Sequence, residues 1–476
     1  QPGTARESAK AKAEKSGWNY YGRVVGGGSV HFTGNYWRFP VVEFEQATRL
    51  GVPDGSSVAD WPISYKDLEP YYTKVEWEIG VSGLAGNPFE PFRSKPFPMP
   101  PLPPKSEGKL LEKAAKQLGY HPWPAPMAIN SQLYRGRSGC VACGICIGNA
   151  CEVRAKSSTL VTMIPEAIAT NRCEIRTHSY ARKIETSAAG RVTGVTYFDR
   201  DRKEVTQRAK AVVLSANGAE SPKLLLMSKS SLFPNGLANS SGEVGRHITF
   251  NGSSGSTGVF EQDINGWKGA VVGMVVWDMF EMPKSSGIYG GGGFDFRFGD
   301  NPLGGAWSYP GEPRWGSAWK KSALANFSRR VFAYGHLTSL PVATNRVDLD
   351  PSVKDAWGLP VPRLTFKGHK NDHKLGEHFG KLCRELMLAA GALKATEAWG
   401  GPDGGGPHLL GTCRMGHDPK KSVVNADHRA HDVKNLFIVD GSNFVTSGRG
   451  QPTMTIQALA FRAADRITDL VKRGAV

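Results

Sequence analysis

The sequence predicts a fold of the α/β class, because two segments far apart in the chain each join a buried strand, a glycine-containing turn and a helix. These segments are residues 210–228 and 435–474. A strand, a glycine turn and a helix together form the crevice in which α/β proteins bind cofactors. The chain has 476 residues, enough for two domains, and its 57 glycines and 31 prolines indicate many turns rather than a helical bundle.

The first of these units is "KAVVLSANGAESPKLLLMS", Lys210–Ser228. Its apolar, β-branched run ends at the turn residues Asn217 and Gly218. A helix is expected to follow, with Ser221 as its N-cap and Pro222 in its first turn.

The second unit is the C-terminal segment, in which an apolar strand over Leu436–Val439 leads to Asp440 and Gly441 and a helix is expected from Pro452. The apolar residues of this helix recur at helical spacing and predict one buried face: Ile456, Leu459, Ala460, Ala463, Ile467, Leu470 and Val471. The helix begins directly after a polar loop, so its free N–H groups and positive dipole end are available to an anionic ligand.

A third glycine-rich stretch is "GRVVGGGSVHFTGNYWRFP", Gly22–Pro40. Consecutive glycines let the backbone approach a large ligand closely. Such a stretch is more often a simple turn, so it gains weight only beside the two units above. The three stretches together predict a site for a nucleotide cofactor.

The net charge of +16 does not predict nucleic-acid binding, because lysines and arginines are scattered, without a block of five. A basic surface that steers an acidic redox partner or an anionic membrane fits better, as does a merely soluble surface. No apolar run approaches the ~20 residues of a spanning helix, so Gly269–Phe280 is expected to be a buried strand and any membrane would be reached through another subunit. The basic stretch Thr4–Gly17 is expected to form a surface helix.

Four of the seven cysteines lie in "GCVACGICIGNAC", with the spacing C-x2-C-x2-C-x4-C. Successive C-x2-C spacings favour an iron–sulfur cluster, because each thiolate can turn inward on a short arc. Disulfides stay open as an alternative, although cysteines three apart bridge awkwardly, and zinc usually takes two separated pairs. The predicted metal ligands are Cys140, Cys143, Cys146 and Cys151.

These motifs resemble the glucose–methanol–choline (GMC) flavoprotein oxidoreductases, in order from about Trp18 to the end of the chain. The resemblance is carried by "GGGSVHFTGNYWRFP", "NGAESPKLLLMS", "GEVGRHITFN" (Gly242–Asn251), "HLLGTCRMG" (His408–Gly416) and "IVDGSNF". Residues 60–83 and the cysteine segment are most similar to the branch of bacterial sugar dehydrogenase subunits, which includes gluconate 2-dehydrogenase, FAD-dependent glucose dehydrogenase and glucoside 3-dehydrogenase.

The resemblance implies FAD as cofactor and a fold that is α/β plus α+β. A Rossmann-like FAD-binding domain, formed by residues 18–45, 152–250 and 425–476, would be interleaved with a substrate domain based on an antiparallel sheet, residues 251–424. Residues 46–151 would form a lid that carries the cysteines. The strand and G-x-G-x-x-G turn with which the family begins do not precede Gly26, so this N-terminal unit is expected to be missing from the sequence.

The same resemblance implies the site residues. His408 would be the base that takes the alcohol proton, and Gln451, at the family's second catalytic position, would orient the substrate by a hydrogen bond. Asn443 is a weaker candidate for the second role. The implied cofactor-binding residues are Gly27, Gly28, Ser29, Thr33, Gly34, Ala181, Gly218, Asp440, Gly441, Pro452 and Thr453.

The resemblance therefore implies an FAD-dependent dehydrogenase that oxidises a CH–OH group of a sugar, glycoside or sugar acid. Electrons would pass through a 3Fe-4S or 4Fe-4S cluster to cytochrome c or a small accessory subunit, in the periplasm or at a membrane reached through a partner. One alternative is an oxygen-using oxidase with structural disulfides. Another is a non-catalytic electron-transfer or docking subunit, against which the intact His408 motif argues.

Overall fold

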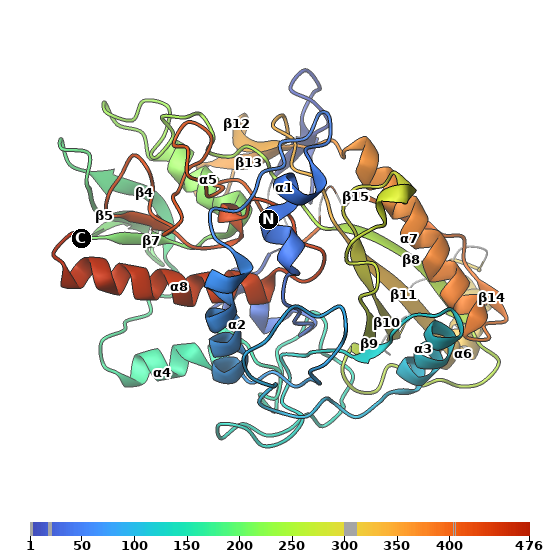
Figure 1. Cartoon of the computed structure of the whole chain (residues 1–476). Helices are drawn as coiled ribbons and strands as arrows, with labels where there is room; N and C mark the ends of the chain where they lie inside the picture. The colour runs from blue at the N-terminus through green and yellow to red at the C-terminus, as the bar shows by residue number, and fades with distance from the viewer. Residues whose placement is uncertain (1–2, 18–20, 299–311, 403, 405) are drawn as a thin grey trace.

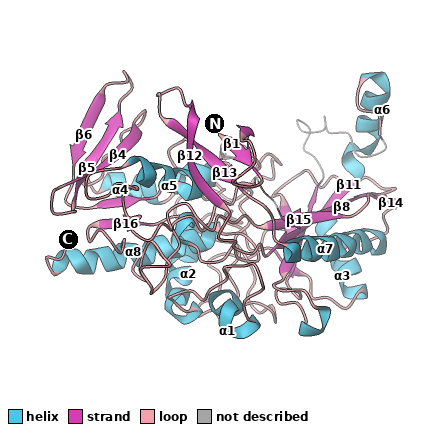
Figure 2. Ribbon diagram, turned by 90° about the horizontal axis from the view of Figure 1, so that it is seen from above, coloured by secondary structure: helices cyan, strands magenta, loops and turns pink. Residues whose placement is uncertain are grey.

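The computed structural model describes residues 3–17, 21–298, 312–402, 404 and 406–476. Two parts lie side by side in Figures 1 and 2. One contains a large sheet with the long helix α7 (Lys370–Ala389) on one face. The other contains smaller sheets around helices α5 (Asn217–Met227) and α8 (Thr453–Lys472). The chain passes between the two parts several times, so each is built from separate segments.

The large sheet has seven strands in the order β14-β8-β11-β10-β9-β3, with β15 also paired to β8. All of its strand pairs are antiparallel. In chain order the strands are β3 (Trp123–Pro124), β8 (Gly252–Val259), β9 (Val272–Val276), β10 (Gly292–Phe298), β11 (Arg330–Leu337), β14 (Lys394–Ala395) and β15 (Trp399–Pro402). The buried strand predicted within residues 269–280 is confirmed as β9.

The two faces of this sheet differ in chemistry because successive side chains of a strand point to opposite sides. On β10, Phe294 and Phe296 join a hydrophobic cluster with residues of α7, and on β11 Ala333 joins the same cluster. Asp295 and His336 therefore point to the opposite face, where both are buried. One face of the sheet packs against helices, and the other carries buried charges.

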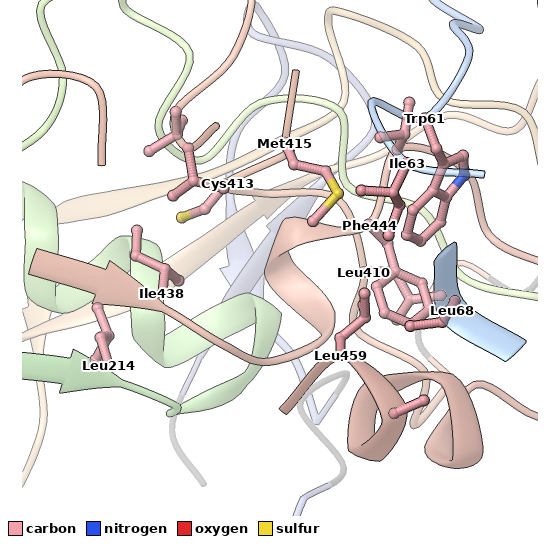
Figure 3. Close-up of a cluster of buried hydrophobic side chains, with 14 of the residues drawn as sticks. Trp61, Ile63, Leu68, Leu214, Leu410, Cys413, Met415, Ile438, Phe444 and Leu459 are labelled. Atoms are coloured by element: carbon pink, nitrogen blue, oxygen red, sulfur yellow. The ribbon is translucent and has the colours of Figure 1, made fainter. Parts of the chain in front are cut away.

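The second part has the α/β organisation predicted from the sequence. Strand β7 (Val212–Leu214) pairs in parallel with β16 (Leu436–Ile438), although more than two hundred residues separate them. A three-stranded antiparallel sheet stands beside them, formed by β4 (Tyr180–Thr186), β5 (Val192–Phe198) and β6 (Glu204–Arg208). Figure 3 shows Leu214 and Ile438 in the buried cluster that also holds Leu459 of α8. A Rossmann-like part interleaved with an antiparallel-sheet part is thus confirmed, whereas the exact domain boundaries stay a prediction.

The helix expected over Thr4–Gly17 is wrong, because this stretch forms the strands β1 (Thr4–Arg6) and β2 (Glu14–Lys15). They extend a four-stranded sheet in the order β12-β13-β1-β2, with β12 (Arg346–Lys354) and β13 (Pro360–Thr365). Polar partners distant in sequence stabilise strand β1 in this sheet: Thr4 donates to Asp350 at 2.7 Å, and Arg6 donates to Thr365 at 2.9 Å.

Helix α5 begins four residues earlier than predicted, at Asn217. The Asn217 side-chain oxygen accepts the N–H groups of Ala219 at 2.8 Å and Glu220 at 3.2 Å, so Asn217 fills the capping role assigned to Ser221. The remaining helices are α1 (Gln46–Leu50), α2 (Tyr65–Ile79), α3 (Ser106–Gln117), α4 (Met163–Ala169) and α6 (Gly316–Asn326). Within the described residues, no helix combines the length and apolar character that crossing a membrane requires.

Candidate active site

His408 lies in the loop before the C-terminal segment and is held by Asn251, the residue directly before β8. The His408 Nδ1 lies 2.5 Å from Asn251 Oδ1. The Asn251 amide nitrogen donates to the carbonyl oxygens of Ser447 at 3.1 Å and Gly448 at 3.4 Å, which fixes its oxygen toward His408. Nδ1 of His408 therefore carries the proton that Asn251 accepts, and Nε2 keeps a free lone pair.

Gln451 lies in a different loop, directly before α8, and its contact is with His336 of β11. The Gln451 amide nitrogen lies 3.1 Å from His336 Nδ1 and 3.0 Å from its Nε2. His336 Nε2 in turn lies 2.7 Å from Asp295 Oδ2 and 2.9 Å from Arg297 Nη2. The C-terminal loop thus meets the charged face of the large sheet at this point.

The antiparallel register brings these side chains together. Asp295 of β10 pairs with Tyr334 of β11, so His336, two residues further on, is the diagonal neighbour of Asp295 on the same face. Asn35, from the glycine-rich stretch near the start of the chain, donates to Asp295 Oδ2 at 2.9 Å. Arg297 pairs with both oxygens of Asp295, at 2.5 and 2.8 Å.

Burial sets the protonation states of the site. Burial, together with the nearby charges of His336 and Arg297, lowers the pKa of His408 to about 3, so His408 is neutral at neutral pH. Burial also lowers the pKa of His336, against the opposing effect of Asp295. Although burial alone would raise it, Arg297 and His336 hold the pKa of Asp295 down at about 2. His408 is therefore unprotonated, and its Nε2 lone pair lies near an ionised Asp295–Arg297 pair.

Several buried polar atoms around this network have no hydrogen-bond partner among the described residues: Asn35 Oδ1, Trp37 Nε1, Trp277 Nε1 and Arg449 Nη2. The rings of Trp37 and His336 meet edge to face, with centroids 5.1 Å apart, and Trp37 also contacts Trp277 at 5.6 Å. Because buried polar groups are normally satisfied, these atoms fit a ligand that carries several hydroxyl groups.

The predicted cofactor residues near the N-terminus lie in a short 3-10 helix and the loop after it. Gly27 and Gly28 have no neighbour within 4 Å of where a Cβ would stand, so their open faces fit a ligand that approaches the backbone. The Ser29 hydroxyl donates to the Gly26 carbonyl at 2.7 Å, and Thr33 Oγ1 accepts the Asn35 N–H at 3.3 Å.

Gly34, with its φ of +84°, packs against Ile129 and therefore serves the turn itself. Ala181 lies on β4, where it pairs with Tyr197 and is exposed.

The two strand–turn–helix units contact each other and the His408 loop through Gly218, Asp440 and Gly441. A Cβ at Gly218 would stand 2.4 Å from the Leu409 carbonyl oxygen, and one at Gly441 would stand 2.8 Å from the Leu410 side chain. One oxygen of Asp440 accepts the Asn217 N–H at 3.1 Å. These residues hold the His408 loop against both helix starts, a packing role that is compatible with cofactor binding nearby.

Pro452 and Thr453 form the start of α8, which no side chain caps. The uncapped N–H groups and the positive dipole end fit an anionic or electron-rich part of a cofactor. Asn443 lies elsewhere: it is fully buried and its amide nitrogen donates to the Ile438 carbonyl. The structure therefore brings His408 and Gln451 into one region and gives Asn443 a backbone contact.

The four clustered cysteines lie in one loop as free thiols. Burial, with smaller contributions from Cys140, Cys143 and Cys151 and against an opposing effect of Lys156, raises the pKa of Cys146 to about 11. The thiols of this loop thus influence one another, but the described residues contain no group of three His, Cys, Asp or Glu side chains arranged to hold a metal ion.

The cysteine loop is attached to the glycine-rich stretch near the N-terminus. Lys156 Nζ donates to the carbonyl oxygens of Cys146 at 2.5 Å, Asn149 at 2.8 Å and Phe32 at 2.9 Å. The Gly148 N–H donates to the His31 carbonyl at 2.9 Å. A buried lysine therefore lies between the thiols and the residues predicted to contact a flavin.

Sequence reasoning missed three members of the site: Asn251, Asp295 and His336. Asn251 stands at the end of the quoted motif "GEVGRHITFN", directly after the buried Phe250, and this position was a usable signal. Asp295 and His336 lie in strands of mainly apolar and small residues, but only the register of β10 and β11 makes them neighbours.

The fold and the site combine an α/β part, in which two parallel strands lead to helices, with a buried, unprotonated histidine beside an antiparallel sheet. Two family models, both described as GMC oxidoreductase, match residues 12–248 and 341–460. The chain belongs to the GMC oxidoreductase family, whose members bind FAD and act on CH–OH donors.

Three similar proteins are dehydrogenases by name. The chain is 35% identical to 2-methyl-1,2-propanediol dehydrogenase of Mycolicibacterium austroafricanum, covering 93% of this chain and 80% of that protein. It is 30% identical to the gluconate 2-dehydrogenase flavoprotein of Pantoea cypripedii (94% and 79% covered). It is 31% identical to the fructose dehydrogenase large subunit of Gluconobacter japonicus (94% and 81% covered).

Solved structures agree on the fold. Pyridoxine 4-oxidase from Mesorbium loti superposes with a TM-score of 0.63 at 16% identity, covering 98% of this chain and 87% of that one. Formate oxidase of Aspergillus oryzae, in a structure that concerns its FAD modification, gives 0.63 at 14% identity, covering 99% and 88%. At this identity the likeness concerns the fold alone.

Proposed function

We propose that this protein is an FAD-dependent dehydrogenase that oxidises a CH–OH group of a sugar, glycoside, sugar acid or related polyol. The observation that carries the proposal is the orientation of His408, whose Nδ1 donates to Asn251 while burial keeps the ring neutral. The names of the similar dehydrogenases, which specify a diol, gluconate and fructose, support this substrate class.

Each group of residues in the site has a separate role in the proposed alcohol oxidation. Bound FAD would supply the acceptor for the hydride of the C–H bond. Nε2 of His408 accepts the proton of the donor hydroxyl, because Asn251 keeps the other ring nitrogen protonated. Gln451 binds the donor through its amide, and Trp37 and Trp277 provide apolar ring faces with N–H groups available to further hydroxyls. The glycine-rich stretch, Asp440 and the start of α8 would hold the cofactor.

The decisive experiment is the anaerobic addition of gluconate, fructose and 1,2-propanediols to the FAD-loaded protein. Bleaching of the flavin absorbance by one of these compounds would support the proposal. If none of a broad panel of sugars, sugar acids and diols reduces the flavin, while a chemical reductant does, the proposed activity is wrong. Repeating the reaction in air would separate a dehydrogenase from an oxidase, because only an oxidase would reoxidise rapidly and form peroxide.

We also propose that the cysteine loop binds an iron–sulfur cluster and that a cytochrome or a small accessory subunit accepts the electrons. The donor set supports this: four free thiols lie in one loop, and Lys156 stands beside them. Since the described residues do not place three thiols as ligands, the loop would have to close around the metal.

Iron and labile sulfide analysis of anaerobically purified protein tests this second proposal. About three or four iron atoms per chain are expected for the clusters that the spacing suggests, and an absence of iron after reconstitution would refute it. The predicted periplasmic or partner-mediated membrane location belongs to this proposal and is checked by fractionating cells that express the full protein.

A further inference from the structure

His336 is a buried histidine whose two ring nitrogens both contact protein groups. It lies on β11 at 3% exposure, on the face of the large sheet that α7 does not cover. Its Nε2 is 2.7 Å from Asp295 Oδ2 and 2.9 Å from Arg297 Nη2, and the Gln451 amide nitrogen lies 3.1 Å from its Nδ1 and 3.0 Å from its Nε2. The rings of Trp37 and Tyr334 pack around it, with centroids 5.1 and 4.7 Å away. The imidazole therefore has one orientation available.

The contact with Asp295 also fixes the tautomer of this ring. An ionised carboxylate only accepts hydrogen bonds, and Asp295 lies nearer to Nε2 than Arg297, which directs its own N–H groups to Asp295. The proton of the neutral His336 ring therefore lies on Nε2 and its lone pair on Nδ1. The group that meets this lone pair must donate. In Gln451 only the NH2 group can do so, and the structure places this nitrogen, not the amide oxygen, within 3.1 Å of Nδ1 and 3.0 Å of Nε2. With the proton on Nε2, only Nδ1 can accept the hydrogen bond of Gln451.

We propose that His336 is a positioning residue for the oxidation of the alcohol: Asp295 fixes its tautomer, and its Nδ1 fixes the amide of Gln451. The amide oxygen and the second N–H of Gln451 are then presented to the donor in one arrangement instead of two. This role compensates for a property of Gln451, which has one more rotatable bond than an asparagine and an amide that can flip. The inference rests on the proposed function, since the positioned group is the one that would bind the donor.

A double-mutant cycle tests whether His336 acts through Gln451. His336→Phe keeps a ring of similar size and removes both nitrogens, and Gln451→Ala removes the amide. The single His336→Phe change is expected to lower kcat by ~10–100-fold, the usual cost of losing a positioned hydrogen bond. The double variant is expected to be no slower than Gln451→Ala alone, because the two residues form one unit. Additive losses would overturn the proposal, and so would wild-type turnover of His336→Phe.

Two further variants separate positioning from packing. His336→Asn can place an amide oxygen near the position of Nδ1, so it is expected to recover most of the rate lost in His336→Phe; equal loss in both would overturn the proposal. The matched control is His247→Phe. His247 is also buried at 3% exposure, and its ring nitrogens contact Ser57 and Glu243 at 2.7 Å each. Combined with Gln451→Ala, this control is expected to give additive effects.

A second readout does not depend on activity. Thermal unfolding of the cofactor-free protein should show that the melting-temperature shifts of His336→Phe and Gln451→Ala are less than additive, because either change breaks the same contact. Additive shifts would show that the contact is absent and would overturn the proposal. If instead no sugar or polyol reduces the flavin of the wild-type protein, the proposed function fails while this unfolding cycle still reports on the contact.

Discussion

Replacing Asn251 by leucine tests the orientation of the predicted base most directly. The substitution keeps the approximate side-chain volume and removes the oxygen that lies 2.5 Å from His408 Nδ1. The ring of His408 can then carry its proton on either nitrogen, and only one of the two tautomers leaves Nε2 free to accept a proton. Leaving a buried donor unpaired costs about 1–3 kcal/mol. If the transition state of flavin reduction is destabilised by this amount, flavin reduction slows by ~5–150-fold.

The assay is the anaerobic single-turnover reduction of the flavin by a saturating donor, followed by absorbance as a function of pH. Because His408 must be neutral to accept a proton, the rate falls as the pH falls through the pKa of His408, which burial lowers to about 3. The wild-type rate is therefore expected to be constant from neutral pH down to about pH 4. In Asn251→Asp, a carboxylate faces the ring and favours the protonated form, so this acid limb should move to higher pH.

Flavin content and melting temperature of both variants serve as controls for folding. An Asn251→Leu variant that loads FAD normally and reduces it at the wild-type rate would refute the reasoning, because the observed contact would then have no part in the reaction. An unmoved acid limb in Asn251→Asp would show that the titrating group is not His408.

Three further outcomes follow from the structure. His408→Ala should lower kcat by ~10²–10⁴-fold at normal flavin content; near-wild-type turnover would remove His408 from the mechanism. Cys143→Ser should leave flavin bleaching by the donor intact but lower the iron content and the rate with a cytochrome, and an unchanged iron content would exclude Cys143 as a ligand. Burial raises the pKa of Asp372 to about 7, so folding is penalised progressively as the pH rises from about 4 to about 7. Asp372→Asn should reduce this loss, on the order of a few kcal/mol, and parallel stability curves for both proteins would contradict it.

The parts of the fold that local sequence signals specify were predicted correctly. Strands β7 and β16 and the helices that follow them were visible because strand, turn and helix lie consecutively in the chain, whereas their parallel pairing is seen only in the structure. Strand β9 was visible as an apolar run. The helix predicted for the N-terminal stretch was wrong because local charge patterning does not reveal distant partners. Arg6 donates a hydrogen bond to Thr365 and pairs with Asp348, and both residues are remote in sequence.

The active site shows the same division. His408 and Gln451 could be named in advance because the motifs that contain them are contiguous and resemble those of a family. His336 and Asp295 could not, since an isolated histidine in a strand is usually an ordinary core residue, and their contact requires β10 and β11 to pair in one register. A shift of one residue between the two strands would turn one of these side chains toward α7 and leave it as an unpaired polar group in a hydrophobic cluster.

The register that closes the core is therefore the same register that assembles the site. Phe294 and Phe296 must face α7 to bury their rings, and this requirement turns Asp295 and Arg297 to the other side. On that side Asp295 accepts a hydrogen bond from Asn35, in the predicted flavin-contacting stretch, at 2.9 Å and is hydrogen-bonded to His336 at 2.7 Å. A buried carboxylate is stable only with such partners. The stability of the sheet and the geometry of the site consequently depend on one another, and substitutions of Asp295 should disturb both folding and turnover, whereas Gln451, on the loop side of the contact, should affect mainly turnover.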